Sequence, residues 1–179
     1  IEPAARYLGV RPPPAALTIE ATNGNFDNQG QRFAPVGVPV TGGLRKDIPV
    51  LGTVVGGTVG DFIMSGEIVD HVRRPPGIAD AKHVYALYIE GDSMAPRYDP
   101  GDLIYVNLSR PARPGDDVVI EMHPDPKTGS VSAYVKRLAA RTPTMLVCRQ
   151  FNPEREIEYP LAKIHRIGRV MRTHELYGV

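Results

Sequence analysis

One serine and one lysine lie in local sequences that could make them a nucleophile and its base. Ser93 belongs to a Gly-Asp-Ser-Met turn, and Lys136 lies in the apolar segment Tyr-Val-Lys-Arg-Leu. A serine hydroxyl attacks a carbonyl only when a neighbour takes its proton, and a lysine can take it only when its pKa falls from about 10.4 toward neutrality. Taken singly, such a turn is common and a strand lysine is usually solvated, so the surrounding sequence has to decide.

Three Gly-Asp dipeptides lie in the stretch that runs from the Ser93 turn to Lys136. They begin at Gly91, Gly101 and Gly115, and each is expected to form a turn that leads into a short strand. After Ile48, short runs rich in β-branched residues recur between turns, at 50–55, 62–69, 85–89, 103–106, 118–122, 131–138, 145–148 and 164–171. This spacing predicts a mainly β, antiparallel domain over residues 47–179.

The order of these segments resembles that of the LexA-like self-cleaving repressors, a serine peptidase family that includes lambda-type phage repressors and UmuD-type mutagenesis proteins. The matching strings are Glu-Gly-Asp-Ser-Met-x-Pro, Gly-Asp-Leu-Ile, Gly-Asp-x-Val-Val, Val-Lys-Arg-Leu, Tyr-Pro at 159–160 and Ile-Gly-Arg-Val at 167–170. The resemblance covers about residues 48–172. The resemblance implies a compact β domain of the LexA and signal-peptidase type, and a serine endopeptidase with Ser93 as nucleophile and Lys136 as base.

The segment 48–57, Ile-Pro-Val-Leu-Gly-Thr-Val-Val-Gly-Gly, is the second informative feature. From the residues alone, a Gly-Gly pair in an apolar strand favours a bulge or a hairpin turn, because glycine packs nothing. The resemblance instead implies that Gly56–Gly57 is the bond that the serine cleaves, where the family more often has Ala-Gly or Cys-Gly. Small residues let the carbonyl approach the hydroxyl closely, but glycine holds that geometry loosely, so slow or lost cleavage is one expectation.

The mechanism implied by the resemblance is intramolecular. Neutral Lys136 removes the proton of Ser93, which attacks the carbonyl of Gly56, while backbone N–H groups at Asp92 and Ser93 hold the oxyanion. Lys136 then protonates the amine of Gly57, and water hydrolyses the acyl-enzyme. The family further implies a homodimer that holds upstream DNA-binding domains at the half-sites of an operator, with a RecA filament or an antirepressor as inducer.

Composition limits the other functions open to the chain. A net charge of +1 argues against a general nucleic-acid binder, because such binders carry a clustered basic face. The single cysteine, Cys148, excludes an internal disulfide framework and is expected to fill the edge of the core. The five histidines lack metal-ligand spacing, so no metal or other cofactor is implied. Without a long apolar stretch or a signal peptide, the protein is expected to be soluble and cytoplasmic, with no membrane partner.

The N-terminal part has a different composition. Residues 1–46 are rich in Gly, Pro, Asn and Gln and have no sustained hydrophobic period, which predicts an extended linker or arm. The phrase Ala-Ala-Arg-Tyr-Leu-Gly-Val at 4–10 is either the tail of a helix-turn-helix domain or a frayed turn within the linker. The isoleucine at position 1 indicates that upstream sequence is missing.

Three alternative functions remain open at this point. A signal peptidase shares the serine and lysine chemistry but needs a membrane anchor, and the sequence has none. A dimerisation and sensing module of a prophage repressor would keep the fold without using cleavage. A UmuD-type accessory protein would be activated by cutting its arm, but that arm starts close to its own N-terminus, whereas 47 residues precede Ile48 here. The last point favours the repressor.

Overall fold

The computed structural model describes residues 44–55 and 62–179 of the chain. Nearly all of the predicted 1–46 linker and the whole Gly56–Gly57 pair lie outside the described residues, so the linker stays a prediction. Within the described ranges, none of the helices has the length and apolar composition that crossing a bilayer requires.

Strands dominate the described part of the chain, as the sequence predicts. They are β1 (Ile48–Val55), β2 (Phe62–Val72), β3 (Val84–Tyr88), β4 (Leu103–Asn107), β5 (Asp117–Met122), β6 (Val131–Arg141), β7 (Met145–Phe151), β8 (Glu154–Pro160) and β9 (Ile164–Val170). Two 3-10 turns, η1 (Pro76–Ile78) and η2 (Leu161–Lys163), and the short helix α1 (Thr173–Tyr177) complete the described elements.

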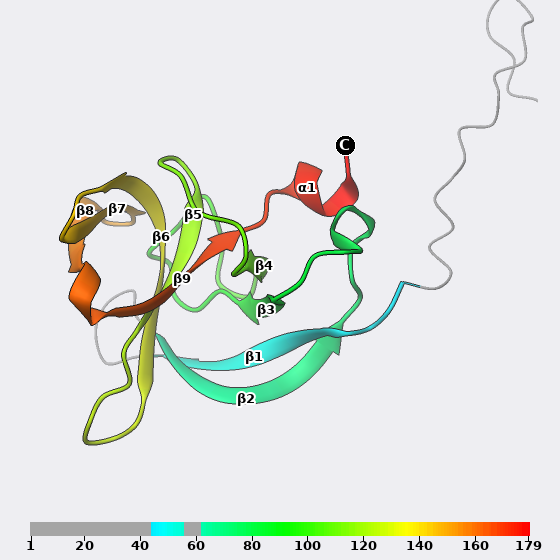
Figure 1. The fold of residues 1–179 in the computed structure, drawn as a ribbon, viewed down its shortest axis with the longest axis horizontal. Coiled ribbons are helices and arrows are strands. Elements are labelled where there is room, and N and C mark those ends of the chain that lie inside the picture. Colours follow the sequence, from blue (N-terminus) through cyan, green and yellow to red (C-terminus); the bar gives the residue numbers. More distant parts are fainter. Residues whose placement is uncertain (1–43, 56–61) are drawn as a thin grey trace, which may run out of the picture. The chain divides into compact units, whose positions relative to one another are not determined.

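These strands form one nine-stranded sheet in the order β2-β1-β3-β4-β9-β5-β6-β7-β8. Within the described residues, neighbouring strands pair antiparallel except for β1 and β3, which run parallel where Val50 meets Ala86. The start of β2 also pairs with β6, which bends the sheet back on itself. Figure 1 shows the result: a long arched β1–β2 ribbon lies along one side, while β7 and β8 lie at the end away from α1.

Each of the eight predicted runs overlaps an observed strand, and one strand escaped prediction. That strand is β8, whose sequence Glu-Arg-Glu-Ile-Glu-Tyr-Pro is mostly charged. It lies at the end of the sheet order and most of its residues are exposed. An edge strand facing water does not need the apolar alternation by which strands are recognised in a sequence.

The three Gly-Asp turns have the backbone geometry that glycine permits. Gly91, Gly101 and Gly115 have φ angles of 72°, 90° and 90°, a region that other residues enter only with strain. The second and third turns lead into β4 and β5, as predicted. The first does not, because the residues after Gly91 continue as turns up to residue 98. Ser93 therefore lies in an irregular segment between two strands.

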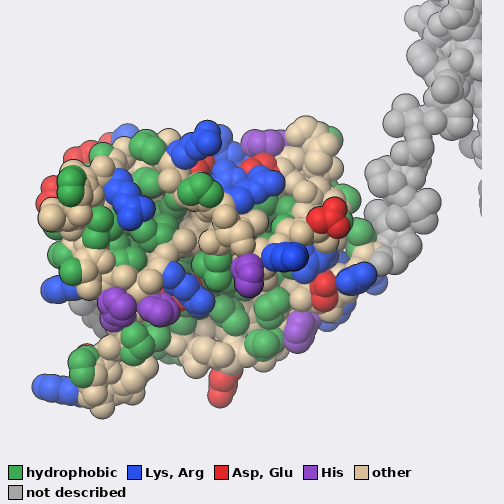
Figure 2. All heavy atoms as spheres, viewed as in Figure 1, with side chains coloured by type: hydrophobic (Ala, Val, Ile, Leu, Met, Phe, Trp, Pro, Cys, Tyr) green, Lys and Arg blue, Asp and Glu red, His purple; other side chains and the backbone are tan. Residues whose placement is uncertain are grey.

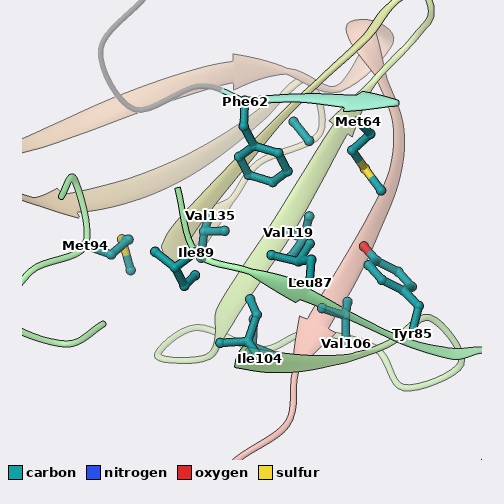
Figure 3. Packing of buried hydrophobic residues seen from close by; sticks show 12 residues of the cluster. Phe62, Met64, Tyr85, Leu87, Ile89, Met94, Ile104, Val106, Val119 and Val135 are labelled. Atoms are coloured by element: carbon teal, nitrogen blue, oxygen red, sulfur yellow. The ribbon is translucent and has the colours of Figure 1, made fainter. Parts of the chain in front are cut away.

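An apolar cluster packs this irregular segment against the sheet. Met94 is 1% exposed and packs with Phe62, Ile89 and Val135 (Figure 3). These residues come from β2, from the segment just after β3, and from β6, so the cluster joins elements that are distant in sequence. Burying such side chains contributes about 1.5–3 kcal/mol each. The packing of Met94 therefore fixes the neighbouring Ser93 next to β6.

Charged side chains of both signs share the surface. In Figure 2 the basic side chains of the visible face are interspersed with acidic and apolar ones. Near α1, Arg169 pairs with both Asp116 and Glu175, and Arg172 pairs with Asp116. Mutual pairing of this kind reduces the positive field of the arginines.

Candidate active site

Ser93 and Lys136 meet in a buried site. Lys136 Nζ donates a hydrogen bond to Ser93 Oγ at 3.0 Å. Ser93 is 5% exposed and Lys136 is 1% exposed. The serine comes from the turn between β3 and β4, and the lysine from the middle of β6. The fold thus brings together the two residues that the sequence singles out, at a distance suited to proton transfer.

The position of Lys136 in β6 accounts for its burial. In the sheet β6 lies between β5 and β7, and Lys136 is the direct partner of Val118, which is completely buried. Leu138 and Cys148 form a second buried cross-strand pair beside it. Such surroundings disfavour the ammonium form relative to the neutral amine.

The turn around Ser93 is held by the connection between β7 and β8. The carbonyl of Ser93 accepts hydrogen bonds from the backbone N–H groups of Phe151 and Asn152, both at 3.0 Å. Asn152 Nδ2 also donates to Asp92 Oδ2 at 2.9 Å. Among the described residues, the backbone N–H groups of Asp92 and Ser93 have no acceptor. Two donors therefore remain for a ligand oxygen at the candidate nucleophile.

Comparison with known proteins identifies the family of this chain. Residues 49–171 match the family model described as Peptidase S24-like. The chain belongs to this family. It is 41% identical over 117 residues to Repressor protein C of Rhizobium phage 16-3, in an alignment that covers 64% of this chain and 44% of that protein. It is 51% identical over 39 residues to prophage repressor CohE of Escherichia coli (strain K12), covering 22% of this chain and 17% of that one.

The resemblance to LexA-like and phage repressors found in the sequence is thereby confirmed. The chain spans less than half the length of the curated relatives it matches. The S24 family is one of serine peptidases, which fits a site built from a serine and a lysine.

The described residues on either side of segment 56–61 lie close to this S24 site. Val55 and Phe62 are direct partners in the β1–β2 pair, and Phe62 is also paired with Ala133 of β6. Ala133 precedes Lys136 by three positions, which corresponds to about 10 Å along a strand. Gly56 and Gly57 themselves lie outside the described residues, so their assignment as the cleaved bond stays a prediction.

A second contact joins β1 to the turn. Thr53 Oγ1 donates to Glu90 Oε1 at 3.2 Å. Thr53 lies three positions before Gly56, and Glu90 lies three positions before Ser93. No role for Glu90 follows from the sequence, because this contact depends on how β1 lies beside the end of β3.

A buried carboxylate beside the site was missed by the sequence analysis. The side chain of Asp117 is 5% exposed and accepts hydrogen bonds from Arg97, Tyr98 and Arg137. Burial by itself raises the pKa of Asp117, but hydrogen bonds from Arg137, Arg97 and Tyr98 outweigh it and lower the pKa below 3.8. The carboxylate is therefore ionised at neutral pH. An acid directly before the apolar run Val-Val-Ile at 118–120 was the available signal.

Cys148 has the structural role expected from its sequence context. It is completely buried. Burial raises the pKa of its thiol to about 12, and the charge of Lys136 offsets only part of that rise. The thiol is thus protonated at neutral pH and a poor nucleophile. In the described part of the chain, no three His, Cys, Asp or Glu side chains are grouped closely enough to hold a metal ion.

Proposed function

We propose that this S24 domain is the C-terminal regulatory domain of a transcriptional repressor of phage or SOS type, and that it inactivates the repressor by cleaving its own Gly56–Gly57 bond. The observation that carries the proposal is the 3.0 Å contact between Lys136 Nζ and Ser93 Oγ in a buried site. Membership of the Peptidase S24-like family and the similarity to two repressors support the regulatory context.

The reaction begins with neutral Lys136, which accepts the hydroxyl proton of Ser93 as Oγ attacks the carbonyl carbon of Gly56. The N–H groups of Asp92 and Ser93 stabilise the negative charge that develops on the carbonyl oxygen. The ammonium of Lys136 then gives its proton to the nitrogen of Gly57, and the peptide bond breaks. A water molecule, deprotonated by Lys136, hydrolyses the ester on Ser93 and restores the hydroxyl.

The substrate of this reaction belongs to the same chain, so its effective concentration depends on where the segment lies. The pairing of Phe62 with Ala133 and the contact between Thr53 and Glu90 support the proposal, because they hold both flanks of the segment near the site. Regulation is then a shift in the population of the docked segment. An inducer that favours the docked state accelerates cleavage without adding any catalytic group.

The proposal extends to partners. The domain forms a homodimer in the cytoplasm, and an upstream DNA-binding domain in each subunit contacts one half-site of an operator. The inducer is a RecA filament or an antirepressor. The similarity to Repressor protein C of Rhizobium phage 16-3 supports a role in a repressor.

The experiment is an incubation of the purified chain at about pH 9 to 10, where more of Lys136 is neutral and no inducer is needed. The expected result is two fragments, with the cut located at Gly56–Gly57 by mass spectrometry. Ser93→Ala, incubated in parallel, is expected to stay intact. Cleavage in that variant at the wild-type rate would contradict the assigned nucleophile.

A second candidate function is a non-cleaving dimerisation and sensing module controlled by an antirepressor. It is favoured by Gly56, which stands where the family more often has alanine and which holds the scissile carbonyl less firmly. Wild-type protein that stays intact after long alkaline incubation, with its fold verified by circular dichroism, would assign the chain to this class. A UmuD-type accessory protein is less well supported, since both relatives named above are repressors.

A further inference from the structure

The carboxylate of Asp117 connects the two segments that carry the candidate nucleophile and base. Arg97 Nε and Tyr98 Oη reach Asp117 Oδ2 at 3.1 and 2.9 Å. From the other side, Arg137 Nε reaches Oδ1 at 2.8 Å and its terminal nitrogen reaches Oδ2 at 3.1 Å. A single buried group at the start of β5 is thus bound by residues of the Ser93 turn and of β6.

The first branch of these contacts leads to the backbone of Met94, the residue that follows the nucleophile. The N–H groups of Arg97 and Tyr98 both donate to the carbonyl of Met94, at 2.8 and 3.2 Å. Met94 follows Ser93 in the chain. Because the side chains of Arg97 and Tyr98 are fixed on Asp117, the Met94–Ala95 peptide, one peptide beyond Ser93, is fixed through them.

The second branch leads to the base and then returns to the serine. Arg137 follows Lys136 in β6, so its hydrogen bonds to Asp117 fix the backbone of the lysine. The guanidinium of Arg137 also lies 5.0 Å from the ring centre of Phe151. The N–H of Phe151 donates to the carbonyl of Ser93. The two peptides that follow Ser93, Ser93–Met94 and Met94–Ala95, are therefore both linked to Asp117.

We propose that Asp117 is a positioning residue for the Ser93–Lys136 pair, setting the place of the nucleophile turn relative to β6. This inference rests on the proposed function, since it assigns a role in the chemistry of that pair. Asp117 touches neither reacting group and acts through Arg97, Tyr98 and Arg137. Without its charge, the two segments lose their common anchor and the contact between Nζ and Oγ loosens.

This arrangement persists under the alkaline conditions at which the lysine becomes neutral. Burial, with a further contribution from Asp117, raises the pKa of Tyr98 to about 12, so its hydroxyl still donates at about pH 9 to 10. Both arginines keep their charge there as well. A loss of geometry in an Asp117 variant is therefore measurable throughout the range in which the site reacts.

The chain provides a matched control on the same strand. Glu121 of β5 is 2% exposed and, like Asp117, is bound by a tyrosine and an arginine, here Tyr85 and Arg166. Among the described residues, no hydrogen bond or ion pair of the Glu121 side chain reaches the Ser93 turn or Arg137. Glu121→Gln removes a buried charge at a cost in stability similar to that of Asp117→Asn, but leaves the anchor of the pair intact.

The test uses the whole chain and a small fluorophosphonate, which labels an activated serine without requiring the cleavage segment. Labelling of Ser93 is followed by intact-protein mass spectrometry below the melting temperature of each variant. Asp117→Asn is expected to slow labelling roughly 10- to 100-fold, because misplacement by about 1 Å has effects of that size. Glu121→Gln is expected to stay within about twofold of wild type, and Asp117→Glu, which restores a carboxylate, to recover part of the loss.

A second pair of variants keeps the test decisive if Asp117→Asn does not fold. The side chains of Arg97 and Arg166 are 45% and 42% exposed, so replacing either disturbs the core little. Arg97→Gln is expected to slow labelling several-fold, and Arg166→Gln to leave it unchanged. The positioning role alone would be overturned if the wild type is labelled at Ser93 and the two variants of each pair slow labelling equally. The pairs are Asp117→Asn with Glu121→Gln, and Arg97→Gln with Arg166→Gln. A wild type that is neither labelled nor cleaved would overturn the proposed function and the positioning role with it.

Discussion

The turn that carries Ser93 and the ribbon of β1 and β2 approach the same buried site from different sides. The turn is bound through the two peptides that follow Ser93. Phe151 and Asn152 bind the first of them, and Arg97 and Tyr98, fixed on Asp117, bind the second. The ribbon reaches the turn through the hydrogen bond of Thr53 and the packing of Phe62. Most of β2 from Ser65 onward is exposed, as is Val54 of β1.

In the proposed mechanism, the reactivity of Ser93 and the docking of the cleavage segment therefore depend on different contacts. A nucleophile and a base held by several directional bonds need little rearrangement before they react. A substrate segment can instead exchange between docked and undocked states where little free energy separates the two. Variants of the turn should therefore change the reactivity of Ser93 itself, whereas variants of the ribbon should change cleavage alone.

The largest effect is expected from removing the base. Lys136→Met should lower self-cleavage by at least about 10³-fold, because no neighbouring group replaces the amine. The same change should raise the melting temperature, since methionine fills a similar volume without burying a polar amine. Cleavage by mass spectrometry and melting by calorimetry on one sample check both. Retained cleavage would show that another group acts as the base.

The second-largest effect is expected from a bulky substitution in the proposed cleavage segment. Gly57→Trp should abolish detectable cleavage, because a bulky side chain holds the scissile carbonyl beyond the roughly 3 to 3.5 Å that attack requires. Fluorophosphonate labelling of Ser93 should continue at the wild-type rate. Unchanged cleavage in a stably folded Gly57→Trp protein would remove this bond from the proposed mechanism.

A smaller effect is expected from the contact between the ribbon and the turn. Thr53→Val removes the hydrogen bond to Glu90 and should slow cleavage roughly two- to tenfold, corresponding to about 0.5–1.5 kcal/mol. Labelling of Ser93 should stay unchanged. A parallel fall of labelling and cleavage would mean that this contact supports the turn rather than the docking of the segment.

The smallest effect is expected on the stability of the fold at acid pH, to which Asp117 contributes. The pKa of Asp117 in the folded chain lies below its ordinary value of 3.8. Its ionised form therefore stabilises the fold above that value, and this contribution is lost as the pH falls below 3.8 through the lowered pKa. As the pH is lowered from about 5 to about 2, the melting temperature of Asp117→Asn should fall less than that of the wild type. An equal loss in both proteins would contradict this contribution.

Ser93 and Lys136 of the candidate site were predictable because each is marked by a short local sequence motif. The Gly-Asp-Ser-Met turn and the Val-Lys-Arg-Leu strand each mark their residue, and β-branched runs mark eight of the strands. The supporting contacts were not predictable in the same way. Arg97, Asp117 and Arg137 lie on separate elements, so only the register of β5 against β6 and the path of the turn bring them together. The strand β8 was missed because its exposed position removes the apolar pattern.

The central claim is that Lys136 is the base that activates Ser93, and one measurement tests it most directly. Rates of Ser93 labelling by a fluorophosphonate and of self-cleavage are followed on the same protein from about pH 6 to about pH 10. Both rates are expected to rise with a common midpoint and to vanish together in Lys136→Met. Labelling of Ser93 that is independent of pH, or that persists in Lys136→Met, would contradict the account.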